Sequence, residues 1–193
     1  MKKESLLQIF SRMPVLETER LTLRAMQVSD AEDMYDYAKR PDVTRYLLWR
    51  PHTDIAYTRQ YLTFLSRRYR IGMHYEWAIV LKESGRMIGT CGFANIDCPN
   101  NTAEIGYVLH PDHRGKGIVA EAALRVMRFG FSVLGLHRIE ARFMKENTPS
   151  EQVMKKLGMH FEGIRREAML VKGLYRDIGI YAILANEFRA MHE

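Results

Sequence analysis

The sequence contains only two cysteines, Cys91 and Cys98. Neither belongs to a Cys-x-x-Cys or Cys/His spacing, so the sequence offers no disulfide framework and no thiolate metal site. We therefore expect reduced thiols in a cytoplasmic protein that binds no metal, with Cys91 in an apolar strand of the core.

Long apolar and long basic runs are missing as well. The apolar patch at residues 6–10 is much shorter than the roughly 20 apolar residues of a membrane span, and it is too short for the core of a signal peptide. The densest basic cluster, at residues 67–70, closes a helical stretch, where cations complement the helix dipole. We expect no membrane insertion and no direct nucleic-acid binding.

What remains is the composition of an ordinary globular chain. Hydrophobic residues make up 47% and charged residues 27% of the 193 residues, which fits one domain over residues 1–193 with a short N-terminal arm or helix at 1–13. The net charge of +6 fits a polyanionic partner such as a nucleotide cofactor. A basic, soluble surface is the simpler explanation of the same charge.

Apolar periodicity predicts an α+β order of elements. Alternation predicts strands at 15–25, 75–81, 87–96, 102–109 and 138–144, and on either side of Lys172-Gly173. Helical spacing and caps predict helices near 29–40, 53–70, 117–134 and 149–157 and after 184, with a loop at 41–53. Hairpins followed by a β-α-β order indicate a mixed, mostly antiparallel sheet with helices on both faces.

One segment carries recognisable chemistry. The strand at 102–109 leads into Arg114-Gly115-Lys116-Gly117-Ile118-Val119, which opens a long helix. The glycines let backbone N–H groups converge, and the helix start adds unpaired donors and the positive end of its dipole. Two basic side chains add charge, so the segment predicts a phosphate or diphosphate site. A Walker loop is excluded, because the residue after Lys116 is glycine rather than Ser or Thr.

A dinucleotide-binding fingerprint is a competing interpretation. Gly115-x-Gly117-x-x-Ala120 fits its relaxed form, and Glu140 stands where a ribose-binding acid would. The insertion at 110–113 between strand and glycines, the short remainder of the chain and the antiparallel hairpins count against an NAD-dependent oxidoreductase.

The same segment resembles the cofactor motif of the GNAT superfamily of acetyltransferases, Arg/Gln-x-x-Gly-x-Gly/Ala between a strand and a helix. The resemblance covers nearly the whole chain: residues 16–24 are similar to the start of the RimJ/RimL-type branch, 147–150 to its Asn-x-x-Ser, and 155–159 to its Lys-Leu-Gly-Phe ending. Val119 departs from the pattern, which has a small residue there. The resemblance implies a GNAT-type sheet, splayed between 102–110 and 138–144, and acetyl-CoA as cosubstrate.

The resemblance also implies how the cofactor is held. The strand that ends at Val108 and Leu109 would bind the pantetheine arm, and the Val108 N–H would donate to the acetyl oxygen. The turn at 114–119 would bind the diphosphate. Asn147 would hydrogen-bond the pantetheine amides, with a plain turn residue as the alternative.

Two candidate catalytic residues follow from the same resemblance. Glu104 matches a general-base position; it shares a strand face with Val108 but stands about 13 Å away, so we expect it to act through ordered water. The tyrosine acid usual in the family is replaced by Met154, which leaves Ser150 as the candidate proton donor to the departing thiolate. A surface carboxylate and a helix cap are the respective alternatives.

The resemblance implies acetyl transfer to a primary amine by direct attack. A protein N-terminal α-amine of the ribosomal-protein type is the expected acceptor and partner, with a small-molecule amine as an alternative. Residues 41–53 would wall the acceptor groove through Trp49 and Arg50, unless Trp49 is a core residue. A non-catalytic CoA-binding module is a further alternative, and both a monomer and a homodimer are compatible with the sequence.

Overall fold

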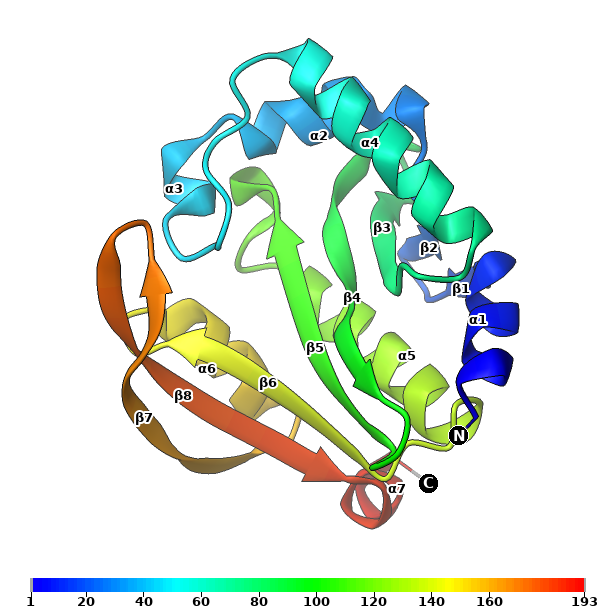
Figure 1. Ribbon diagram of the computed structural model, residues 1–193, viewed down its shortest axis with the longest axis vertical. Helices are drawn as coiled ribbons and strands as arrows, with labels where there is room; N and C mark the ends of the chain where they lie inside the picture. The colour runs from blue at the N-terminus through cyan, green and yellow to red at the C-terminus, as the bar shows by residue number, and fades with distance from the viewer. Residues whose placement is uncertain (1, 193) are drawn as a thin grey trace.

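The computed structural model describes residues 2–192, and its strands form one sheet (Figure 1). The strands are β1 (Leu16–Glu17), β2 (Leu21–Arg24), β3 (Glu76–Leu81), β4 (Met87–Asp97), β5 (Thr102–Leu109), β6 (Arg138–Met144), β7 (His160–Val171) and β8 (Leu174–Leu184). The helices are α1 (Lys3–Ser11), α2 (Ala31–Ala38), α3 (Pro41–Thr44), α4 (Ile55–Arg70), α5 (Ile118–Ser132), α6 (Thr148–Lys156) and α7 (Ala185–His192). Short 3₁₀ turns, η1 (Val28–Asp30) and η2 (Pro111–His113), precede α2 and follow β5.

The sheet has the order β1-β2-β3-β4-β5-β6-β8-β7. Neighbouring strands are antiparallel except β5 and β6, which run parallel. These two strands pair only from Thr102 opposite Arg138 to Glu104 opposite Glu140, and beyond that point they separate (Figure 1). The predicted mixed sheet, splayed between these strands, is confirmed.

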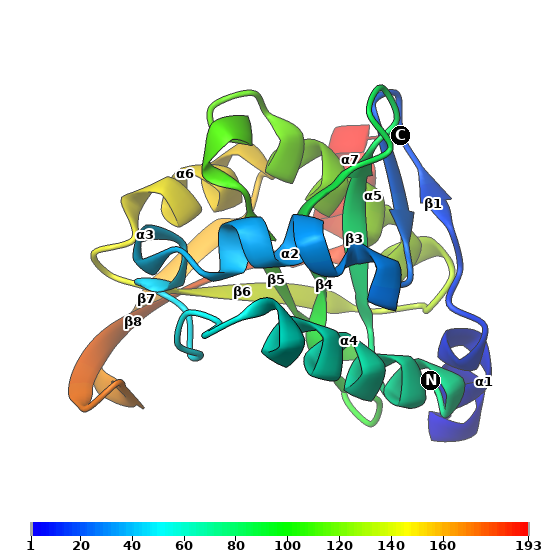
Figure 2. The ribbon, with the colours of Figure 1, turned by 90° about the horizontal axis from the view of Figure 1, so that it is seen from above.

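Helices cover both faces of the sheet, as the sequence predicts (Figure 2). On one face, α2 and α4 form a core with β3, in which Leu62 packs near Ala78. On the other face, α5, α6 and α7 share a larger core that includes Val126. Helix α5 lies very close to the sheet at Gly130, because a Cβ there would come within 2.8 Å of the Phe93 ring.

Two of the predicted elements are wrong in detail. The strand expected at 15–25 is broken into β1 and β2, since Leu21 donates its N–H to Oγ1 of Thr18 at 2.9 Å and closes a turn. The region 41–53 is not all loop, because Pro41 opens the single turn of α3, a position that suits its fixed φ.

The N-terminal arm is a docked helix, with Leu6 and Phe10 of α1 buried in the core. Cys91 is buried as predicted, and both cysteines are free. Within residues 2–192, no helix combines the length and the apolar character that a membrane crossing requires.

Candidate active site

A cleft of about 460 Å³ lies beyond the point where β5 and β6 separate. Its walls come from parts of the chain far apart in sequence: the end of β5, the turn into α5, helix α6, and α3 with the residues after it. Most of the predicted cofactor residues meet here. The predicted residues that line the cleft are Val108, Leu109, Arg114, Gly115, Gly117, Ile118, Val119, Asn147 and Ser150.

The start of α5 points its backbone donors at this cleft. Gly115 and Gly117 have φ of 74° and 75°, values that glycine adopts without strain and that bend the chain sharply into the helix. The first N–H of α5 with an intrahelical acceptor is that of Glu121, bonded to the oxygen of Gly117 at 3.0 Å. The N–H groups of the preceding residues 118–120, all of which line the cleft, are the unpaired donors of a helix start.

Three cations surround this helix start. Arg114 lines the cleft from the turn, and Lys156 lines it from the end of α6. A Cβ added at Gly117 would lie 3.7 Å from Nζ of Lys156 and 3.8 Å from Nη2 of Arg20. Arg20 is held in place by Glu121, whose Oε2 is 2.6 Å from Nη2. The sequence interpretation missed Lys156 and Arg20, because their proximity to the turn arises only on folding.

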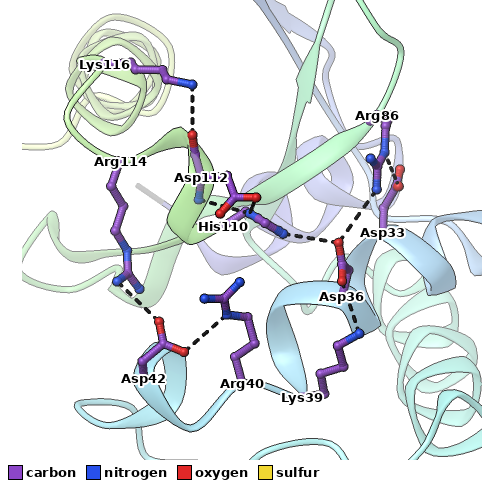
Figure 3. A network of polar contacts seen from close by, with 10 residues as sticks. All are labelled: Asp33, Asp36, Lys39, Arg40, Asp42, Arg86, His110, Asp112, Arg114 and Lys116. Carbon is purple, nitrogen blue, oxygen red and sulfur yellow. Dashed lines mark hydrogen bonds and ion pairs between the residues drawn. The ribbon is translucent and has the colours of Figure 1, made fainter.

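A polar network ties the turn to the opposite wall (Figure 3). Nη1 of Arg114 lies 3.7 Å from Oδ2 of Asp42 in α3. Nε2 of the buried His110 lies 3.3 Å from Oδ2 of Asp36 in α2. Lys116, predicted to bind the cofactor, instead donates from Nζ to a backbone oxygen of η2 at 2.8 Å, and it does not line the cleft. Within residues 2–192, no cluster of His, Cys, Asp and Glu is arranged to hold a metal ion.

Ser150 joins a short chain of hydroxyl groups at the cleft. Its Oγ lies 3.0 Å from Oη of Tyr107, and the same Oη donates to the Ser150 backbone oxygen at 3.1 Å. Burial raises the pKa of Tyr107, against the lowering effect of this hydrogen bond. The alternative that Ser150 caps its helix is wrong, since the N-cap is Asn147. Met154, at the position of the family's usual tyrosine, is buried in the core.

Glu104 lies at the closed end of the gap, where β5 and β6 still pair, opposite Glu140. Nε of Arg142 is 3.5 Å from its Oε2. Burial raises the pKa of Glu104, Arg142 lowers it and Glu140 raises it further. The structure therefore brings Glu104 into a cluster with Arg142 and Glu140 rather than into the lining of the cleft.

A second cavity, of about 140 Å³, lies on the sheet face covered by α2 and α4. Val108 lines both this cavity and the larger cleft. Trp49 lines the second cavity, whereas Arg50 is exposed near Lys172, whose pKa is lowered by burial and then by the charge of Arg50. Glu76 also lines it, and no sequence signal indicated this, because carboxylates at strand ends are ordinarily surface groups.

The comparisons with known proteins agree on the family. The sequence model of the acetyltransferase (GNAT) domain matches residues 20–160. The chain is 39% identical over 176 residues to the uncharacterized N-acetyltransferase p20 of Bacillus licheniformis, which covers 91% of this chain and 99% of that protein. A solved GNAT-family acetyltransferase from Bacillus anthracis matches with a TM-score of 0.81 at 30% identity, over 90% of this chain and 100% of that one.

More distant relatives in Escherichia coli K12 have named acceptors. The [ribosomal protein uS5]-alanine N-acetyltransferase is 25% identical over 170 residues, which cover 84% of this chain and 86% of that protein. The spermidine N(1)-acetyltransferase is 25% identical over 173 residues, or 89% of each chain.

The sheet that splits between two parallel strands, with a cleft at a helix start, belongs to a fold shared with a solved acetyltransferase. The match over residues 20–160 makes the assignment specific: the chain belongs to the GNAT family of acetyltransferases. The predicted family, its RimJ/RimL-like relatives and the enzyme class are confirmed. The interpretation as an NAD-dependent oxidoreductase is wrong, because only β5 and β6 of the described sheet run parallel.

Proposed function

We propose that this chain binds acetyl-CoA in the large cleft and transfers the acetyl group to a primary amine, with a protein N-terminal α-amine as the acceptor. The observation that carries the proposal is the convergence, in one cleft, of the unpaired N–H groups of α5 with the cations Arg114 and Lys156. Backbone donors, a helix dipole and two or three fixed cations are the groups that bind a diphosphate.

The open edge of β5 suits the pantetheine arm. Beyond Glu104, no strand of the described residues pairs with β5 on its β6 side, so the backbone groups that face this side are available to an extended ligand that pairs as an added strand. The side-chain amide of Asn147 lines the same cleft, and no hydrogen bond to another described residue occupies it. It can therefore donate to or accept from the amides of the arm.

Acetyl-CoA supplies an acetyl group on a thioester, which a neutral amine can attack directly. The N–H of Val108, expected from the resemblance to donate to the acetyl oxygen, instead faces Thr90 of β4, because hydrogen-bonded pairs alternate along the ladder from His110 and Ile88. In the proposal, a backbone N–H on the open side of β5 donates to the acetyl oxygen as negative charge develops there. The hydroxyl pair of Ser150 and Tyr107 donates a proton toward the departing sulfur. Glu104, held beside Arg142, is retained as a prediction for a base that acts through water.

Two observations bear on the acceptor. The named relatives acetylate a protein alanine or spermidine, so both a peptide amine and a polyamine are within reach of the family. The cavity beyond Val108 is lined by one carboxylate and by mainly apolar and aromatic side chains, which suits a single ammonium group better than a polycation. The cavity volume of about 140 Å³ also suits a small-molecule monoamine, which is therefore the second candidate acceptor.

The test is an acceptor screen with acetyl-CoA. Thiol release and product mass are measured for peptides that begin with Ala, Ser or Met, for small monoamines and for spermidine. We expect acetylated peptides. Binding of acetyl-CoA should stabilise the protein by about 2.7 kcal/mol at a 100-fold excess over Kd. If the protein shows this stabilisation but acetylates no amine, it is a non-catalytic CoA-binding module instead. We assign the reaction to the cytoplasm, where free thiols such as Cys98 stay reduced.

A further inference from the structure

The small cavity and the large cleft lie next to each other at the sheet, since Val108 lines both. Across the strands, Glu76 of β3 pairs with Gly92 and Gly92 with Gly106, while Val108 pairs with Thr90 on the same face. A Cβ added at Gly106 would meet nothing within 4 Å. The row of backbone between Glu76 and the open edge of β5 therefore carries no side chain of its own.

The carboxyl group of Glu76 has no counter-ion among the described residues. The contact from Nε2 of His74 to its Oε2 is 3.6 Å, longer than a hydrogen bond. That nitrogen is itself buried and without a partner. Burial lowers the pKa of His74 to about 4, so the ring is neutral near pH 7 and cannot balance a carboxylate.

Glu76 is nevertheless reachable from the cavity. Its side chain is 28% exposed, and it lines the cavity together with Val108. The protein packed around it raises its pKa to about 7 by burial. An unpaired carboxylate in such a place costs stability, and a bound ammonium group would supply the missing positive charge.

Aromatic rings form the wall of the cavity near α4. The His52 ring lies 5.3 Å from that of Trp49, 4.9 Å from Tyr57 and 5.8 Å from Tyr61, centroid to centroid. Its Nδ1 is 2.8 Å from Oγ1 of Thr58, a contact that orients the ring. Ring faces attract a cation, and this complements the Coulomb attraction of the carboxylate. The apolar remainder of the lining comes from Met26, Met34 and Ala38.

We propose that this cavity is the acceptor subsite, in which Glu76 binds the ammonium group of a primary monoamine on a small apolar body and takes up its first proton. The inference rests on the proposed function and specifies its acceptor. The N-terminal residue of a peptide and a free small monoamine share this chemistry. A polyamine would bring further charges into a cavity whose lining includes a single carboxylate.

The proton and electron balance is simple. The ammonium R–NH₃⁺ gives one proton to the Glu76 carboxylate, which frees the nitrogen lone pair. The lone pair forms the C–N bond to the acetyl carbon, the C–S bond breaks with its electron pair on sulfur, and a second nitrogen proton reaches sulfur through the Tyr107–Ser150 hydroxyls. Glu76 then releases its proton to water. In sum, R–NH₃⁺ and acetyl-CoA give R–NH–CO–CH₃, CoA–SH and H⁺.

The ionisation of Glu76 can be distinguished from that of the neighbouring groups in a pH profile. Several titratable groups lie around Glu76. They are Tyr37 of α2, His52 of the loop before α4, Tyr57, Tyr61 and Tyr69 of α4, His74, and Cys91 of β4. Burial lowers the pKa of His52, and it raises the pKa of Tyr61 to about 12. The pKa of Glu76, about 7, lies between these histidine and tyrosine values.

The experiment compares the wild-type protein with Glu76→Gln, Glu76→Asp and the matched control Glu83→Gln, which lies on the exposed turn after β3. Glu104→Gln is measured beside them, because the resemblance makes Glu104 the competing base. Rates are measured from pH 6 to 9 with peptides that begin with Ala, Ser or Met, with butylamine and with spermidine. Acetyl-CoA affinity is measured by calorimetry without any amine, and folding by thermal unfolding.

We expect Glu76→Gln to lower kcat/KM for the amine by about 10²- to 10⁴-fold, the usual contribution of a general base. The inflection near pH 7 should disappear while the inflection of the amine itself remains, and acetyl-CoA affinity should not change. Glu76→Asp should keep the inflection at a reduced rate, and Glu83→Gln should behave as the wild type. Comparing the rates with the peptides and with butylamine decides whether the acceptor is a peptide N-terminus or a free small monoamine.

Other outcomes overturn the inference. If wild-type protein acetylates an amine and Glu76→Gln keeps both the rate and the inflection, or if Glu104→Gln removes the inflection instead, Glu76 is not the proton acceptor while the proposed function stands. If spermidine is the best acceptor, the monoamine subsite is wrong. If no amine is acetylated by the wild type, the proposed function fails and this inference with it.

Discussion

Glu76→Gln should also change how the stability of the protein depends on pH. The pKa of Glu76 is about 7 in the folded protein, against its usual value of 4.5, so the folded state binds this proton more tightly than the unfolded state. Between those two values the unfolded chain has lost a proton that the folded chain retains. The contribution of Glu76 is therefore most favourable below pH 4.5, falls as the pH rises, and is constant above pH 7.

The size of the effect follows from the two pKa values. One pKa unit corresponds to about 1.4 kcal/mol. Integrated from pH 5 to pH 8, the change from 4.5 to about 7 lowers the free energy of unfolding by about 2.5 kcal/mol. Glutamine has no charge to bury, so the variant loses this dependence. The stability of Glu76→Gln relative to wild type should thus rise by about 2.5 kcal/mol over that range.

The assay is urea unfolding of both proteins at pH 5, 6, 7 and 8. Taking the difference between them cancels the titration of every group that the substitution leaves alone. Glu83→Gln, on the exposed turn, is the matched control for the same chemical change away from the cavity. A difference between Glu76→Gln and wild type that does not vary with pH would refute the reasoning, because it would mean that the Glu76 carboxyl is hydrated or paired in the folded protein.

Three further outcomes test the proposed acetyl-CoA site in the large cleft. Lys156→Ala should raise the KM for acetyl-CoA about 5-fold, since a partly exposed ion pair contributes up to about 1 kcal/mol, and the rise should shrink at high salt. Equal effects at low and high ionic strength would contradict a phosphate contact. Ser150→Ala and Tyr107→Phe should each lower kcat with little change in KM. The double variant should be no slower than the slower single variant, because the two hydroxyls act together. If the two losses in kcat multiply in the double variant, the hydroxyls do not share one proton path. Gly117→Val should lower thermal stability by roughly 1–2 kcal/mol, because φ is 75° there and a side chain disfavours that geometry. Unchanged melting and acetyl-CoA affinity would show that the turn adjusts.

Local patterns were sufficient for most of the helices and strands and for the glycine turn at 114–119. The segment at 114–119 places its glycines and its helix start next to one another in sequence, so the donors converge without help from the rest of the chain. The split of the sheet was accessible only through family resemblance. The break at Thr18 was missed, because a side-chain hydrogen bond in a turn leaves the alternating pattern intact.

Residues that act from a distance could not be assigned in the same way. Ser150 was a candidate from its motif, but its partner Tyr107 comes from another strand. Lys156 reaches the helix start only because α6 packs beside α5. Lys116 carries the expected charge at the expected place, and its side chain turns to a backbone oxygen instead.

The local sequence was therefore enough to predict the glycine turn at 114–119, the strand that leads to it and the helix that follows. The tertiary structure determines which charged side chains face that turn. It also places the Glu76 carboxyl beside aromatic rings, without a counter-ion among the described residues. The physical reason is that backbone donors depend on neighbouring torsion angles, whereas the desolvation of a carboxylate depends on everything that packs around it.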